Sequence, residues 1–186
     1  KEHRQDIKDV IAYQTSISLC GSTNSLHIIK TVLKQLLFSF NITGINLMLL
    51  DQNKLKMAFH FEKSGSTIKP VREIKIGEGI AGVVAEQKRL QAVPDTSKNE
   101  KFVGNQSKPH SLLSLPVISN NTVFGVLNIM RPKNIYFEED EVNMAAIVAN
   151  RISLALEKDR LDKSLSRQKN TLEKILKTTT DGLIMV

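Results

Sequence analysis

The chain has 186 residues, of which 41% are hydrophobic and 24% charged, and its formal net charge is +7. This length is typical of one domain with additional helices, and two complete domains would be a tight fit. No stretch approaches the roughly 20 consecutive apolar residues that cross a bilayer, so we expect a cytoplasmic protein without membrane contact in this part of the chain. Cys20 is the only cysteine, which excludes an internal disulfide and a cysteine-based zinc site within one chain.

The excess of positive charge does not by itself indicate a nucleic-acid partner. Basic residues are mixed with acidic ones, as in residues 157–163, and no tract combines arginines with the aromatic residues of a base-stacking surface. We interpret these charges as solvated faces of helices and expect no nucleic acid among the partners.

The first part of the chain predicts two helices followed by three strands. Apolar residues at helical spacing predict an N-terminal helix within residues 1–21 and a second helix with an apolar stripe from Leu26 to Phe40. Residues 45–50 and 54–61 predict two antiparallel strands joined by a turn, and residues 71–76 predict a third strand.

The middle of the chain predicts a helical crossover and a second hairpin. Residues 77–87 are rich in small residues and predict a short helix that packs closely against a sheet or a ligand, while residues 95–102 predict a short helix or lid-like loop. The second hairpin covers residues 112–118 and 123–130, and Pro116 places its first strand at an edge or a bulge. Helices on the faces of an at least partly antiparallel sheet make an α+β layered fold.

From Glu138 onward the pattern is helical for about 40 residues. Apolar residues recur every seven positions, with a polar interruption at Gln168, which is the spacing of a coiled coil. We expect this helix to pair with a second copy of itself in a parallel homodimer. The residues assigned to the seam are Ile147, Leu154, Leu161, Leu165 and Leu172, continued by Ile175.

Five short motifs follow one another in a fixed order: Gly79-Ile80-Ala81-Gly82, Val93-Pro94-Asp95, Ser114-Leu115-Pro116-Val117, Phe124-Gly125-Val126-Leu127 and the run 136–141. Their identity and order resemble the GAF family of small-molecule sensor domains, over residues 22–160. The resemblance implies a GAF-like central antiparallel sheet with helices on its faces, flanked by a long N-terminal and a long C-terminal coiled-coil helix. It also implies a regulatory domain rather than an enzyme.

The sequence after this domain resembles a second known arrangement. Residues 161–178 are expected to form a signalling or linker helix, and residues 179–186 are similar to the truncated start of a PAS domain. Such tandems are typical of bacterial histidine kinases and diguanylate cyclases, so we expect an output domain of this kind further along the same chain.

The GAF resemblance implies a ligand pocket between the sheet and the two crossovers. The expected ligand is cyclic AMP or cyclic GMP, and no catalytic or metal site is expected. Backbone amides at a helix N-terminus, next to glycines without side chains, favour a phosphate. Carried over by position, the expected ligand-binding residues are Asn46, His60, Phe61, Gly79, Ile80, Ala81, Phe102, Val103, Ser107, His110 and Ser111.

Several alternatives stay open from the sequence. Asn46 would otherwise be a solvent-facing strand residue, and the glycines would serve only close packing. Members of the family that bind cyclic nucleotides carry an Asn-Lys pair where this chain has Arg131-Pro132, and we expect an ion pair between Arg131 and Asp140 in its place. The alternative functions are a ligand-free dimerisation spacer whose pocket is filled by Phe61 and Phe102, and a haem sensor with His60 or His110 as the axial ligand.

Overall fold

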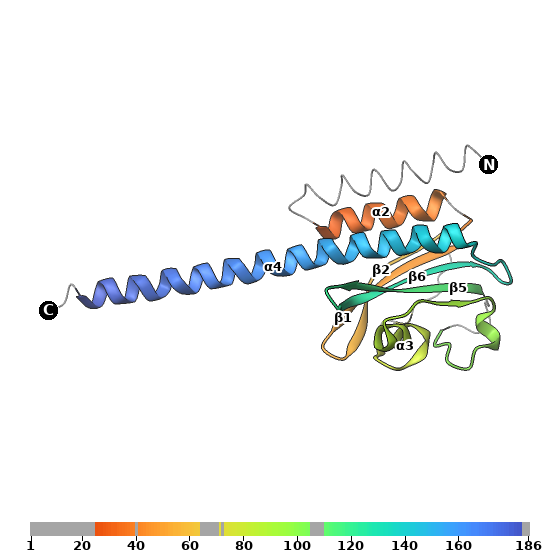
Figure 1. Ribbon diagram of the computed structural model, residues 1–186, viewed down its shortest axis with the longest axis horizontal. Helices are drawn as coiled ribbons and strands as arrows, with labels where there is room; N and C mark the ends of the chain where they lie inside the picture. The colour runs from red at the N-terminus through yellow and green to blue at the C-terminus, as the bar shows by residue number, and fades with distance from the viewer. Residues whose placement is uncertain (1–24, 40, 64–70, 72, 105–109, 184–186) are drawn as a thin grey trace.

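The computed structural model describes residues 25–39, 41–63, 71, 73–104 and 110–183 (Figure 1). The predicted N-terminal helix, the candidate ligand residue Ser107 and residues 184–186 lie outside this part of the chain. The predicted α+β fold is confirmed. Its elements are α2 (Ser25–Ser39), β1 (Gly44–Asp51), β2 (Lys54–Glu62), β3 (Glu73–Lys75), α3 (Gly79–Gln87), β4 (Gln91–Val93), η1 (Thr96–Lys98), β5 (His110–Ser119), β6 (Thr122–Pro132) and α4 (Glu139–Leu183).

The strands form one antiparallel sheet of six strands, in the order β3-β2-β1-β6-β5-β4. Both predicted hairpins, β1–β2 and β5–β6, are confirmed. The strand predicted over residues 71–76 is confined to β3. The sequence does not predict β4 as a strand, because a paired run of three residues is too short to show alternation.

The larger core lies between one face of the sheet and the helices α2 and α4 (Figure 1). Apolar residues recur at three- and four-residue spacing on both helices, and this spacing aligns them along the face turned toward the sheet. On the strands the same core takes alternate residues, because successive side chains point to opposite faces. Its buried members include Ile29, Leu33 and Leu36 of α2, Val148 and Ile152 of α4, and Ile45, Leu47, Leu113, Leu127 and Ile129 of the sheet.

A smaller core lies between α3 and the opposite face of the sheet. Close approach of α3 depends on Gly82, since a Cβ at this position would lie 2.3 Å from the backbone oxygen of Lys75. The buried members of this core include Met48, Leu55, Ile80, Val84, Leu112 and Val126. The glycine-rich run therefore serves close packing, whatever else it does.

Pro116 lies inside β5, between β6 and β4 in the sheet order. β4 pairs only with residues 112–114, so the missing N–H of Pro116 falls where β5 has no neighbour on that side. The register with β6 shifts directly afterwards, between Val117 and Ile118. The predicted edge or bulge position is confirmed.

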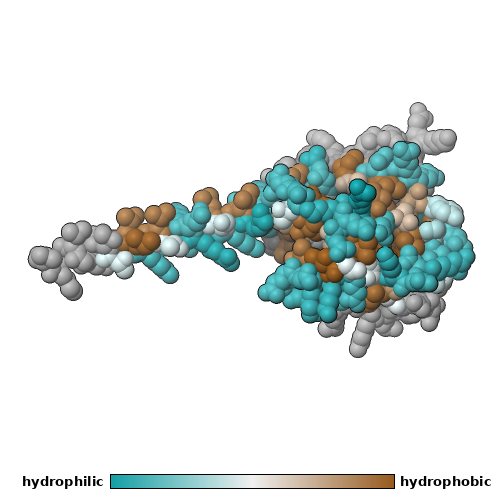
Figure 2. All heavy atoms as spheres, turned by 60° about the horizontal axis from the view of Figure 1, so that its bottom comes forward, coloured by the Kyte–Doolittle hydropathy of each residue, from teal (hydrophilic) through white to brown (hydrophobic). Residues whose placement is uncertain are grey.

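α4 is 45 residues long and projects far beyond the sheet (Figure 1). Its buried residues end at Ala155, and every side chain from 161 to 178 is exposed. Apolar side chains line this projecting part (Figure 2). α4 continues without a break to Leu183. The expected start of a second domain at residues 179–186 therefore stays a prediction. None of the helices in the described ranges combines the length and the apolar character that a membrane span requires.

Candidate functional site

A row of polar residues crosses the face of the sheet that α3 covers. His60, Asn46, Asn128, Ser114 and Gln91 are paired across β2, β1, β6, β5 and β4 in one continuous register. Paired residues of neighbouring strands point to the same face, so this row shares a face with Met48 and Leu112 of the smaller core. Polar side chains inside an otherwise apolar face indicate a site for a polar molecule.

Hydrogen bonds connect the three central residues of the row, and along the row each residue donates to the next. The Ser114 hydroxyl donates to Oδ1 of Asn128 at 2.6 Å, and Nδ2 of Asn128 donates to Oδ1 of Asn46 at 2.8 Å. Ser114 and Asn128 are buried, whereas Asn46 is half-buried. Because Asn46 accepts from within the chain, its own NH₂ group is left to donate toward a ligand.

His60 extends the row next to Asn46. Its Nε2 lies 3.2 Å from Oε1 of Glu62, which places the proton of a neutral imidazole on Nε2. Its Nδ1 is buried and has no partner within the described chain. A buried acceptor without a hydrogen-bond partner costs free energy. A ligand that donates a hydrogen bond to Nδ1 would therefore bind more tightly.

The first residues of α3 border this face of the sheet. Ile80 and Ala81 are buried in the smaller core, and Gly79 has φ +66. A Cβ at Gly79 would lie 3.0 Å from a methyl group of Val103, so even this position is tightly packed. Val103 itself is 37% exposed.

Phe102 and His110 form another border of the same face. Phe102 is half-buried against the smaller core, and its ring meets the His110 ring edge-on, with centroids 5.3 Å apart. Phe102 thus turns toward the smaller core. The His110 backbone N–H donates to Oγ1 of Thr96, which ties the start of β5 to η1.

Two of the predicted ligand residues lie on the opposite face of the sheet, so their assignment to the α3 face is wrong. Phe61 pairs with Ile45 and packs against the α2 and α4 core, where it also lies under Lys34 Nζ. Ser111 pairs with Arg131, is buried, and donates its hydroxyl to the Pro94 oxygen at 2.6 Å. Alternation along each strand is the physical reason, since their neighbours His60 and His110 face α3.

The Val93-Pro94-Asp95 motif has a structural role. Asp95 Oδ1 accepts from the backbone N–H and the hydroxyl of Ser97, at 3.0 and 2.6 Å, and Oδ2 lies 3.0 Å from Lys133 Nζ. The Ser97 hydroxyl is the main cause that lowers the pKa of Asp95, and Lys133 adds to it. The motif fastens the turn before η1 to the connection between β6 and α4.

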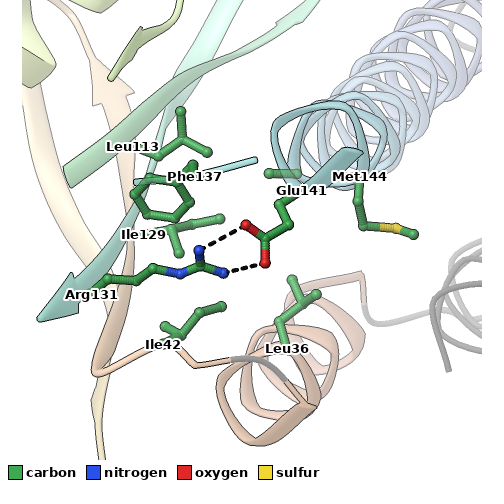
Figure 3. A pocket seen from close by; sticks show the side chains of 9 residues that line it. Leu36, Ile42, Leu113, Ile129, Arg131, Phe137, Glu141 and Met144 are labelled. Carbon is green, nitrogen blue, oxygen red and sulfur yellow. Dashed lines mark hydrogen bonds and ion pairs between the residues drawn. The ribbon is translucent and has the colours of Figure 1, made fainter. Parts of the chain in front are cut away.

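The ion pair predicted between Arg131 and Asp140 is instead made with Glu141 (Figure 3). Arg131 Nη1 donates to Oε2 and Nη2 to Oε1 of Glu141, at 2.8 and 2.7 Å, and both side chains are at least 93% buried (5% and 7% exposed). Oε2 also accepts from the backbone N–H of Glu138 at 2.9 Å, which caps α4. Asp140 is exposed, so the prediction was wrong by one residue.

A small apolar pocket surrounds this ion pair between the sheet, α2 and α4 (Figure 3). Its volume is about 20 Å³, enough for roughly one water molecule. The guanidinium also lies 4.5 Å from the centre of the Phe137 ring. The pocket therefore packs the ion pair and does not hold a metabolite. Its lining is Leu36, Ile42, Leu113, Ile129, Arg131, Phe137, Glu141, Met144 and Ala145.

The polar row has three further members that the sequence does not predict, namely Asn128, Ser114 and Gln91. Asn128 carries the same signal as Asn46, a polar residue inside an apolar strand. In the parts of the chain that are described, no group of three or more His, Cys, Asp or Glu side chains is placed to hold a metal ion.

The GAF domain model matches residues 26–156 of the chain. Among solved structures, a protein assigned as a GAF sensor from Burkholderia vietnamiensis has a TM-score of 0.73 at 15% identity, covering 84% of this chain and 98% of that one. The GAF domain of a phosphoenolpyruvate-protein phosphotransferase from Coxiella burnetii has 0.74 at 16%, covering 84% and 96%. Free methionine-R-sulfoxide reductase from Neisseria meningitidis has 0.74 at 16%, covering 83% and 91%. At these identities the likeness shows the fold alone, and no curated protein sequence matches the chain.

Proposed function

Since the chain belongs to the GAF family, we propose that it is a regulatory domain that binds a small molecule on the α3 face of its sheet and signals through α4. The observation that carries the proposal is the polar row, with a donor at Asn46 next to an unpaired acceptor at His60. Burying a polar group costs free energy unless it is hydrogen-bonded, and the buried Nδ1 of His60 has no partner among the described residues. One solved structure with this fold is a reductase, so a regulatory role is a proposal about this chain and not a property of the fold.

The donor and acceptor at Asn46 and His60 suit the edge of a purine base. Adenine offers the N7 acceptor beside the N6 amino donor, and guanine offers O6 beside its N1–H. This supports a cyclic mononucleotide, cyclic AMP or cyclic GMP, as the ligand. The phosphate would lie toward the first turn of α3, where the helix dipole and backbone N–H groups favour an anion.

We expect cyclic AMP or cyclic GMP to raise the melting temperature of the protein. At a hundredfold excess over the Kd, binding adds about 2.7 kcal/mol, which corresponds to roughly 5–10 °C for a protein of this size. Asn46→Leu removes the donor and should weaken binding about fivefold, since one net hydrogen bond contributes about 1 kcal/mol. Thermal unfolding against nucleotide concentration measures both effects.

The matched control for this experiment is Asn143→Leu, which changes an exposed asparagine on α4. It should leave the nucleotide-dependent shift unchanged. If neither nucleotide shifts the melting temperature, the cyclic-nucleotide proposal is wrong. If Asn46→Leu and wild type respond equally, the ligand lies elsewhere.

We further propose that α4 pairs in parallel with α4 of a second chain. Leu161, Leu165, Leu172 and Ile175 are each more than half exposed and lie at coiled-coil spacing on the part of α4 that projects from the domain. This row of apolar side chains gives a second copy a matching surface (Figure 2). The pair would carry the state of the domain toward an output domain in the same chain.

A further inference from the structure

The two-residue turn Asn120–Asn121 connects helices that lie on opposite faces of the sheet. On one side Lys88, the C-cap of α3, donates from Nζ to the backbone oxygen and to Oδ1 of Asn121, both at 2.8 Å. On the other side Nδ2 of Asn120 donates to Oε1 of Glu157 in α4, at 2.9 Å. This turn thus links the C-terminal end of α3, the helix that covers the polar row, to α4.

The backbone at both ends of this connection has little conformational freedom. Asn120 and Asn121 have φ +46 and +62, and they close the hairpin as its two central residues, between the pair Ser119 and Thr122. Tight hairpins of this kind need positive φ at both positions, which asparagine tolerates. Lys88 also has a positive φ, +55, and its N–H closes the last turn of α3 on the Val84 oxygen. Between these two constrained backbone segments, the link is the side chain of Lys88, whose ammonium group bonds Asn121 twice.

The residues around the turn contact α4 at several points. The Ser119 hydroxyl donates to Oε2 of Glu157 at 2.6 Å, and the Ser153 hydroxyl donates to the Ile118 oxygen at 2.7 Å. The Arg160 guanidinium lies 5.4 Å from the centre of the Phe124 ring. Hydrogen bonds from Ser119, and then from Asn120, lower the pKa of Glu157, so the acceptor is a carboxylate at neutral pH. Together with the hydrogen bond from the Ser25 hydroxyl of α2 to Oδ1 of Asp159, at 2.8 Å, these contacts hold α4 just before it leaves the domain at about residue 161.

We infer that the Asn120–Asn121 turn is a mechanical relay from α3 to α4. The inference rests on the proposed function, in which a ligand lies between α3 and the sheet. A ligand that moves the end of α3 changes the hydrogen bonds of Lys88 to Asn121, and the stiff turn passes this change to Glu157. α4 is then held more or less firmly at the point where it begins to project. Two sites that bias one shared element are coupled in both directions.

The test is hydrogen exchange of the full chain without any ligand. Lys88→Met removes the donor and keeps the apolar stem, and it should speed exchange of residues 150–162 of α4 about twofold to fivefold, as expected for the loss of about one hydrogen bond. Lys88 has no bond to α4, so this effect must pass through the turn. The reciprocal variant Glu157→Met should speed exchange at the end of α3, residues 83–88.

The matched control is Lys56→Met, which removes another exposed lysine that bonds near a hairpin turn, to Asp51 at 2.7 Å. It should leave exchange of residues 83–88 and 150–162 unchanged, and β1 and β6 should stay fully protected in all variants. In the Glu157→Met background, we expect that adding Lys88→Met has no further effect on α4.

Two outcomes would overturn the inference. One is a change after Lys88→Met that is confined to α3 and the turn. The other is a double variant whose effect on residues 150–162 equals the product of the two single effects, as for independent sites. Because the experiment uses no nucleotide, its result does not depend on nucleotide binding. The relay can be absent although a cyclic nucleotide binds, and it can be present although neither nucleotide binds.

Discussion

Replacing either partner of the buried ion pair, as Arg131→Met or Glu141→Met, is expected to lower the free energy of unfolding by about 3–5 kcal/mol. The two side chains are almost completely buried and share two hydrogen bonds, so each single change leaves one charge in the apolar pocket without its counter-ion. Urea unfolding at one fixed protein concentration measures the loss.

The double variant Arg131→Met/Glu141→Met should recover most of this loss, because a buried ion pair and an apolar replacement of similar volume are often nearly equal in stability. A deficit of about 1 kcal/mol should remain, since Glu141 also caps the N–H of Glu138. Lys56→Met is the control: its exposed ion pair with Asp51 should contribute less than about 1 kcal/mol. Single variants as stable as this control would show that the pair is open to solvent.

Leu161→Lys together with Leu165→Lys is expected to convert the proposed dimer to a monomer of 20.8 kDa. Both leucines are exposed on the projecting part of α4, and lysine at seam positions would bring like charges together in an apolar interface. Sedimentation equilibrium over a range of concentrations reads the mass directly. The domain itself should stay folded, because neither residue contacts its core.

The control for this variant is Ser166→Lys with Asn170→Lys, which adds the same charge on the other side of the helix. It should remain dimeric. A further cysteine variant, Leu172→Cys with Cys20→Ser, should form a disulfide with its own copy in a parallel pair, since equal positions then face each other. The proposed pairing would be contradicted by a wild-type protein that is monomeric throughout. It would also be contradicted if the Leu172→Cys variant formed a dimer without the disulfide, as in an antiparallel pair.

The arrangement of helices and strands was predictable because each one carries its own local pattern. The stripe of α2 and the hairpin strands β1 and β2 show their period within the segment itself. β4 lacks such a pattern, since three residues pair only because β5 lies beside them. Local periodicity therefore predicts the long elements and not the short edge strand.

The candidate site was only half predictable. Asn46 stands out as a polar residue in an apolar strand, but its partner Asn128 is 82 positions away, and strand register is not visible in the sequence. The choice between His60 and Phe61 depends on the irregular register of β1 and β2 after Leu47. Which side chain faces the ligand is therefore decided by pairing.

The ion pair shows the same limit for a helix. Asp140 and Glu141 are adjacent acids in the first turn of α4, and each step along a helix rotates the side chain by about 100°. That rotation turns Glu141 toward Arg131 and leaves Asp140 exposed. The sequence indicates an acidic partner for Arg131, but the phase of the helix selects it.

Native mass spectrometry of the wild-type protein, equilibrated with cyclic AMP or cyclic GMP, tests the central claim most directly, because one spectrum reports both the oligomer and its bound molecules. We predict a dimer with one nucleotide in each chain, and a clearly lower occupancy for Asn46→Leu at the same concentration. A dimer that carries neither an added nucleotide nor any other small molecule would contradict the sensing role and identify the chain as a ligand-free dimerisation spacer.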